Sequence, residues 1–109
     1  GYAVDRASNG VLQDVHWAVG LFGYFPTYSL GNVYAGCLYE GLRAAVPGLD
    51  DQLAAGDTSQ ATGWLQGALQ RHGGLRSPRN TIAQASGLTP GPEPLLAYLQ
   101  AKIRALYRL

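Results

Sequence analysis

GVLQDVHWAVGLFGYFPTYSLGNVY, residues 10–34, holds more chemically capable side chains than any other stretch of this sequence. Glycines and a proline interrupt it, and its apolar residues recur with a helical period on both sides of the break at Gly23 and Pro26. The pattern predicts a helix over about 11–22, a tight aromatic turn, and a second helix over about 28–45. The turn should hold polar side chains against aromatic ones.

Placed on a helix, residues 11–22 divide into an apolar stripe and a neighbouring polar edge. We interpret the apolar stripe as a core face, formed by Leu12, Val15, Val19 and Phe22. Gln13, His16 and Trp17 should project together from the edge, with Asp14 on the far side of Trp17. A histidine beside an apolar stripe is more often structural than catalytic, and a tryptophan more often packs, so this spacing allows a site without requiring one.

The stretch GVLQDVHW resembles a motif of the carboxypeptidase Taq family, which are zinc-dependent metallocarboxypeptidases. Five residues match the pattern G-x-x-Q-D-x-H-W, namely Gly10, Gln13, Asp14, His16 and Trp17. The following GLFGYFPTYSLGN is also similar to these enzymes, and EPLLAYLQAKIRALYRL resembles their closing helix more weakly. The resemblance covers nearly the whole chain and implies that residues 1–109 form one helical segment at the C-terminus of such an enzyme.

The resemblance also implies that part of the chemistry lies elsewhere. Family members are several times longer, and they hold zinc through an H-E-x-x-H helix and a later Glu upstream of the matched motif. Their I-R-x-x-A-D motif, linked to substrate binding, is upstream too. None of these motifs occurs in this sequence. We therefore expect zinc as the cofactor of the full-length enzyme, no metal ligand in this segment, and an upstream partner within the same polypeptide. The absence of a starting methionine favours the same interpretation.

An exopeptidase has to hold the terminal carboxylate of its peptide substrate, which requires hydrogen-bond donors. The resemblance and the residue types together suggest catalytic roles for His16 and Tyr24, and substrate-binding roles for Gln13, Asp14 and Tyr28. Gly10 and Trp17 are expected to be structural members of the motif. Asp14 has alternative roles, because it could orient His16, orient an upstream Arg, or pair structurally.

The composition restricts the other function classes. Apolar residues make up 47% of the chain and charged residues 14%, against about 25% in an ordinary soluble domain. So few charges suggest that part of the surface faces other protein, although a Gly- and Ala-rich chain also lowers the figure. The net charge of +1 gives no electrostatic case for nucleic acid or membrane as a partner. Cys37 is the single cysteine, which excludes a disulfide within the chain and favours a cytoplasmic protein. A homodimer is possible by analogy with the family.

Further helices are predicted over about 49–55, 58–72 and 78–86, and from Glu93 to near the C-terminus. Asp57 and Gln60 resemble a capping box, and Ser77 followed by Pro78 resembles a helix start. Three glycines inside the helix over 28–45 predict close approach of neighbouring helices, namely Gly31, Gly36 and Gly41. No segment shows strand alternation. The fold class is therefore all-α, a compact bundle of about four to six helices within a larger all-helical enzyme.

Two other functions are compatible with the sequence. The chain could be a non-catalytic helical interaction module, which would need neither zinc nor an upstream part. It could also be an autonomous hydrolase that uses His16 with Asp14. The second alternative is disfavoured because no Ser or Cys nucleophile is paired with these residues locally, and because the two side chains point apart on a helix.

Overall fold

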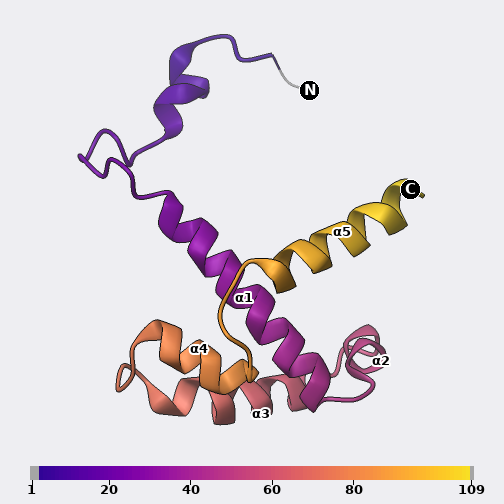
Figure 1. Ribbon diagram of the computed structural model, residues 1–109. Helices are drawn as coiled ribbons and strands as arrows, with labels where there is room; N and C mark the ends of the chain where they lie inside the picture. The colour runs from indigo at the N-terminus through magenta and orange to yellow at the C-terminus, as the bar shows by residue number, and fades with distance from the viewer. Residues whose placement is uncertain (1–2, 109) are drawn as a thin grey trace.

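The computed structural model describes residues 3–108 and contains five α-helices (Figure 1). They are α1 (Pro26–Ala45), α2 (Leu49–Ala54), α3 (Ser59–Ala68), α4 (Pro78–Ser86) and α5 (Glu93–Tyr107). Three single turns of 3-10 helix are η1 (Ala7–Asn9), η2 (Val11–Gln13) and η3 (Gln70–His72). Residues 3–108 include no strand, which confirms the all-helical class. None of the helices in this range is long and apolar enough to cross a bilayer.

Local capping chemistry explains the boundaries that the sequence predicted well. Ser77 accepts a hydrogen bond from the Asn80 N–H (3.4 Å), and Gly87 ends α4 with a φ of +74°. The helices predicted over 49–55 and from Glu93 are confirmed. The helix predicted over 58–72 ends at Ala68 and continues only as η3.

The predicted capping box at Asp57 is wrong. Thr58 takes the N-cap position of α3 without a capping side chain. The Asp57 carboxylate instead accepts a hydrogen bond from the Ser59 N–H (2.8 Å), two residues ahead. In a capping box the Asp57 carboxylate would accept from the backbone N–H three residues ahead. The turn engages this carboxylate with the N–H two residues ahead instead.

The helix predicted over 11–22 is also wrong. Only η2 is helical there, and irregular turns join it to α1; we call the whole stretch before α1, residues 3–25, the arm. The Asp14 carboxylate accepts from the His16 N–H (2.9 Å), which favours a turn over the helical ladder, and Asp14 itself is extended with a ψ of 117°. Gly20 and Gly23 then take φ values of +78° and +73°, which end the possibility of a regular helix.

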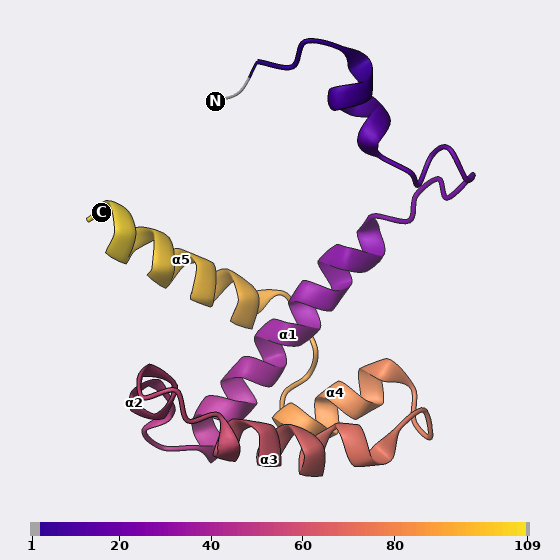
Figure 2. The same ribbon diagram turned by 180° about the vertical axis from the view of Figure 1, so that it is seen from behind.

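The arm consequently exposes the apolar stripe that was predicted to face the core. Leu12, Val15, Val19 and Phe22 are between 64% and 71% exposed. Figures 1 and 2 show the arm extending beyond the N-terminal end of α1, away from α3 and α4. No described element covers this stripe, because the interior of the segment lies at the other end of α1.

Helix α1 is the axis of the segment, and it contacts α3, α4 and α5. The most buried apolar side chains come from α1, the turn after it, α2 and α4, namely Cys37, Val46, Leu49 and Ile82. Cys37 is fully buried, and its thiol faces the Gly91 carbonyl oxygen at 3.6 Å. Arg43 in α1 makes paired 2.7 Å contacts with the Asp50 carboxylate, which fix α2 against the end of α1.

Two of the three helical glycines explain how α1 packs so closely. A Cβ placed on Gly36 would lie 2.7 Å from the Leu95 backbone nitrogen in α5. A Cβ on Gly41 would lie 2.7 Å from the Ser86 Cα in α4. At Gly31 such a Cβ would meet nothing within 4 Å apart from its chain neighbours and the backbone of its own helix. The predicted close approach is confirmed at Gly36 and Gly41 and is wrong at Gly31.

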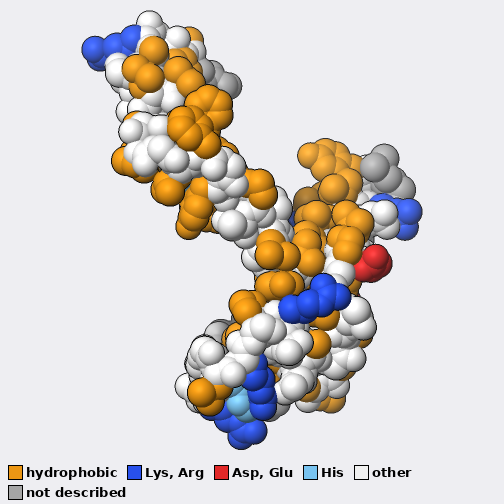
Figure 3. Space-filling model, turned by 60° about the vertical axis from the view of Figure 1, so that its left-hand side comes forward, with side chains coloured by type: hydrophobic (Ala, Val, Ile, Leu, Met, Phe, Trp, Pro, Cys, Tyr) orange, Lys and Arg blue, Asp and Glu red, His pale blue; other side chains and the backbone are white. Residues whose placement is uncertain are grey.

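The segment is more open than the compact bundle that the sequence predicted. Its radius of gyration is 18.1 Å, whereas a compact chain of this length has about 13 Å. Its accessible surface is 8189 Å², against about 5,800 Å² for a folded monomer of this mass. Figure 3 shows apolar side chains gathered along the arm and over α5, which projects on the other side of α1. The physical reason is that the arm and α5 extend from α1 in different directions without packing on one another.

Candidate functional site

The candidate site is assembled where the arm returns to the start of α1. Asp14 follows η2, and its Oδ1 accepts two hydrogen bonds from the same residue, one from the His16 N–H (2.9 Å) and one from the ring Nδ1 (2.8 Å). The His16 side chain is 24% exposed and the Asp14 side chain 35%. This arrangement holds the imidazole against the backbone turn, and it is the contact that the expected orienting role of Asp14 would use.

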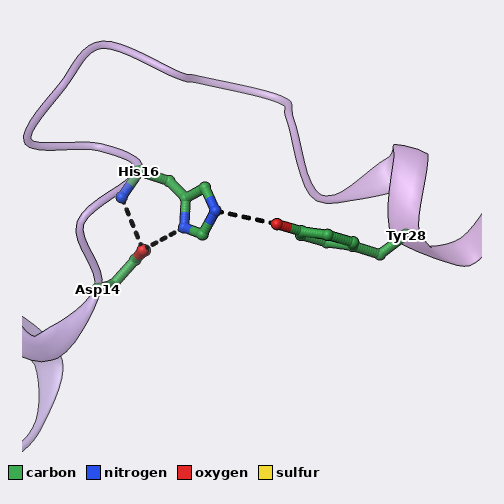
Figure 4. A network of polar contacts seen from close by, with 3 residues as sticks. All are labelled: Asp14, His16 and Tyr28. Carbon is green, nitrogen blue, oxygen red and sulfur yellow. Dashed lines mark hydrogen bonds and ion pairs between the residues drawn. The ribbon is translucent and has the colours of Figure 1, made fainter.

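The other ring nitrogen of His16 reaches across the arm to α1. His16 Nε2 lies 3.2 Å from the Tyr28 hydroxyl oxygen, and the chain between the two residues loops away from the contact (Figure 4). Asp14, His16 and Tyr28 thus form one continuous hydrogen-bonded chain, which we call the relay. It joins two elements that are twelve residues apart in sequence.

Aromatic rings support the His16 ring on several sides. Tyr24 stacks on it with a centroid separation of 5.5 Å, and Phe25 meets it edge-on at 4.8 Å. Tyr24 and Tyr28 are themselves edge-on at 5.3 Å. Phe25 is not among the site residues that the sequence predicts. Its spacing of three residues from Tyr28 at the start of a helix could have indicated a shared face.

The remaining predicted site residues lie on the arm but outside the relay. The Gln13 amide donates to the Ser8 carbonyl and so closes the turn around η2. Gly10 lies under Val4, whose Cγ1 would be 2.7 Å from a Cβ at that position. Trp17 is 65% exposed and meets Phe22 at 5.7 Å. The structure therefore brings together His16, Asp14, Tyr24 and Tyr28, and leaves Gln13, Gly10 and Trp17 apart from them.

The contacts change the acidities of both ends of the relay. Hydrogen bonds from the His16 N–H and then from its ring lower the pKa of Asp14 below its ordinary value. Partial desolvation raises the pKa of the Tyr28 phenol, and the neighbouring Tyr24 and Asp14 add to this effect. At neutral pH, Asp14 is therefore a carboxylate that can only accept, and Tyr28 keeps a proton to donate.

Protonation of Asp14 at low pH should weaken the contact that holds His16 to Asp14. Because the pKa of Asp14 is lower in the folded state, its contribution to folding is present above its unfolded value, about pH 4, and is lost as the pH falls through the folded value. The His16 amide signal in NMR spectra should accordingly shift as the pH falls below about 4. The Asp14→Asn variant should show no such transition. An unchanged His16 amide in the parent chain over this range would contradict the assignment.

The structure supplies the paired Asp14 and His16 that an autonomous hydrolase would need, but the residues it describes place no nucleophile next to them. The side chains of Asp14 and His16 were expected to point apart, and that expectation is wrong, because the turn brings them to 2.8 Å. Within residues 3–108, however, the hydrogen-bonding partners of the His16 ring are a carboxylate and a phenol, with no Ser or Cys among them. Cys37 is fully buried in α1. The pairing therefore has no nucleophile to activate.

The residues described in the structure contain no group of three His, Cys, Asp or Glu side chains that could hold a metal ion. A zinc site needs at least three such ligands around one point. The residues present therefore do not fit a resident zinc ion, and the chemistry assigned to this segment does not pass through one.

The helical architecture, together with the motif GVLQDVHW in the arm, defines the class of protein to which this chain belongs. Residues 1–103 match the carboxypeptidase Taq (M32) metallopeptidase family, and the chain belongs to that family. It is 40% identical to Thermostable carboxypeptidase 1 of Thermus thermophilus over 107 residues, 98% of this chain and 21% of that protein. It is 38% identical to Carboxypeptidase 1 of Bacillus subtilis over 109 residues, 100% of this chain and 22% of that protein.

Solved structures agree with this assignment. The crystal structure of the M32 carboxypeptidase from Deinococcus radiodurans R1 superposes with a TM-score of 0.84 and 37% identity, over 100% of this chain and 22% of that one. The crystal structure of BsuCP gives a TM-score of 0.83 and 36% identity, over 97% and 21%. The chain thus spans about a fifth of the length of the relatives that it matches.

Proposed function

We propose that this chain works as the C-terminal part of a metal-dependent carboxypeptidase that removes amino acids from the C-terminal ends of peptides. The observation that carries the proposal is the relay, because it lies within the arm motif that matches the family and outside the packed interior of the segment. In this proposal the arm lines the substrate cleft and orients the peptide C-terminus. Zinc and the general base are contributed by the upstream part of the enzyme.

The chemistry of the arm suits a carboxylate ligand. A peptide carboxylate is bound by groups that donate hydrogen bonds, and charged partners strengthen those bonds. Tyr24 and Tyr28 offer phenol donors at the start of α1, next to a histidine that can carry a positive charge. Asp14 balances that charge from the opposite side of the ring. Gln13, which was predicted to bind substrate, gives one amide N–H to the Ser8 carbonyl and keeps its second N–H for a ligand.

One observation favours the second candidate, a non-catalytic interaction module. The segment exposes far more surface than a compact monomer of its mass, and much of it is apolar. The same surface is equally well accounted for by contact with the upstream helices of an enzyme. We favour the peptidase because the chain belongs to a metallopeptidase family, whereas the exposed apolar surface does not distinguish the two candidates.

A chimera tests the proposal directly. The segment of Bacillus subtilis Carboxypeptidase 1 that matches residues 1–109 would be replaced by this chain, and the purified protein assayed for stepwise loss of C-terminal residues from a peptide by mass spectrometry. We expect a folded, zinc-containing chimera that shortens the peptide. The same enzyme truncated before the segment serves as the inactive control. A folded chimera with full zinc content and no activity would contradict the proposal.

A further inference from the structure

A groove lies between α1 and α5, where α5 begins beside the middle of α1 (Figure 1). Its volume is about 380 Å³, and sites for small ligands usually have about 300–1,000 Å³. The two helices line it with six residues, namely Asn32, Ala35, Gly36, Tyr39, Leu95 and Tyr98. Apart from one amide and two phenol hydroxyls, these side chains are apolar. The proposed function gives this groove no role so far.

The aromatic wall of the groove is held in place from both helices. Tyr39 in α1 and Tyr98 in α5 meet edge-on with a centroid separation of 5.6 Å. Arg43 lies 5.4 Å from the centre of the Tyr39 ring and donates to its hydroxyl oxygen at 2.7 Å. Lys102 lies 5.6 Å from the centre of the Tyr98 ring and donates to its hydroxyl oxygen at 3.3 Å. Because both rings are already positioned, a ligand loses little free energy in ordering them.

The groove lies on the same face of α1 as the relay. Asn32, Ala35 and Tyr39 follow Tyr28 at spacings of four, seven and eleven residues, which place side chains on one stripe of an α-helix. With a rise of about 1.5 Å per residue, Ala35 lies about 10 Å along the axis from Tyr28, and Tyr39 about 16 Å. An extended peptide advances about 3.3 Å per residue. A peptide that ends at Tyr28 and follows α1 therefore reaches the groove at about its fourth residue from the C-terminus.

The chemistry of the groove favours an extended peptide as its occupant. An extended chain carries backbone N–H and C=O groups that need partners. The exposed amide of Asn32 can donate to one such group and accept from another. A packed helix satisfies its own backbone groups and would gain nothing from this amide. Beyond Asn32, Leu95 and the two tyrosine rings suit an aliphatic or aromatic side chain.

We propose that the groove between α1 and α5 is a subsite of the substrate cleft, which takes an apolar side chain about four residues from the peptide C-terminus while Asn32 pairs with the adjacent peptide backbone. The inference rests on the proposed function, because it takes as ligand a peptide held by its C-terminus. It adds a preference among substrates that the carboxylate-binding end of the cleft does not provide. Peptides long enough to reach the groove, with an apolar residue there, should be the better substrates.

The experiment compares two acetylated hexapeptides as substrates of the chimera. One consists of alanine throughout, and the other has leucine as the fourth residue from its C-terminus. We expect kcat/KM to be about tenfold higher for the leucine peptide, a factor typical of an apolar pocket. Ala35→Leu fills the groove and should remove this preference. Asn32→Ala should lower kcat/KM for both hexapeptides, with a smaller effect on N-acetyl-alanyl-alanine, which is too short to reach the groove.

Ala44→Leu is the matched control, because Ala44 is exposed on the same helix and does not line the groove. This variant should keep the preference for leucine. An active chimera with no preference, or with the same preference in Ala35→Leu, would overturn the inference and leave the proposed function standing. An inactive chimera would contradict the proposed function and this inference with it.

Other occupants of the groove would give different results. If upstream helices of the enzyme fill it, Ala35→Leu should lower the yield of folded, zinc-containing chimera, and Ala44→Leu should not. If a second copy fills it, Ala35→Leu should convert a dimer to a monomer in analytical ultracentrifugation. Either result would overturn the assignment of the groove to the substrate.

Discussion

Replacing His16 with alanine should lower kcat/KM of the chimera by about 10- to 100-fold while its zinc content stays unchanged. The imidazole is the shared partner of the Asp14 carboxylate and the Tyr28 phenol, so its removal leaves both without their hydrogen bond. The loss of one positioned hydrogen bond to a charged group changes a rate by a factor on this order. Steady-state kinetics and metal analysis of the same preparation would measure both quantities.

His72→Ala is the matched control for this prediction. His72 lies in η3, outside the arm, and its pKa is lowered by burial and by the nearby Arg76 and Arg71. The ring is therefore mainly neutral at pH 7, and its loss should change kcat/KM little. Loss of zinc from His16→Ala in proportion to the loss of activity would show that His16 belongs to the metal side of the site.

Alanine at Gly36 or Gly41 should destabilise the segment, whereas alanine at Gly31 should stabilise it. A Cβ at Gly36 or Gly41 would meet backbone atoms of α5 or α4 at 2.7 Å, and overpacking of this kind costs about 1–3 kcal/mol. At Gly31 a Cβ meets nothing within 4 Å, so the gain in helix propensity, up to about 1 kcal/mol, should remain. The free energy of unfolding in urea would be compared across the three variants.

The three variants make a sharp comparison because they place the same atom in the same helix. The two destabilising changes act on different neighbouring helices, so their effects should add in the double variant. A Gly36→Ala variant as stable as Gly31→Ala would mean that α5 does not sit against α1 as described. The corresponding result at Gly41 would mean the same for α4.

Helices α2, α4 and α5 could be predicted because their limits are set by local chemistry. Ser77 with Pro78 starts α4 and Gly87 ends it, and no distant contact is needed to recognise either signal. The arm could not be predicted in this way. Residues 11–22 have a helical period, but a turn forms at Asp14 instead. Its carboxylate competes for the His16 N–H, which a helix would use in its own backbone bonds.

In the candidate site, too, the sequence predicted the local features and missed the contacts that depend on the fold. The residue types of the relay were identified from the motif, and Asp14 was among the expected partners of His16. The predicted helix excludes their contact, because residues two apart on a helix do not face one another. Tyr28 was selected for its phenol, but its distance of twelve residues from His16 gave no local signal that the two would meet. Phe25 was missed because it offers packing and no polar chemistry.

The contact between His16 and Tyr28 closes a loop of chain, and closure has an entropic cost. For about twelve residues this cost is on the order of 2 kcal/mol, whereas an ordinary hydrogen bond contributes a net 0.5–1.5 kcal/mol. The single hydrogen bond that spans this loop, between His16 and Tyr28, therefore does not offset the closure cost by itself. The stacked and edge-on rings of Tyr24, Phe25 and Tyr28 around His16 make up the difference, at about 0.5–1.5 kcal/mol for each aromatic pair. The aromatic residues thus determine whether the relay exists, and the hydrogen bonds determine how it is aligned.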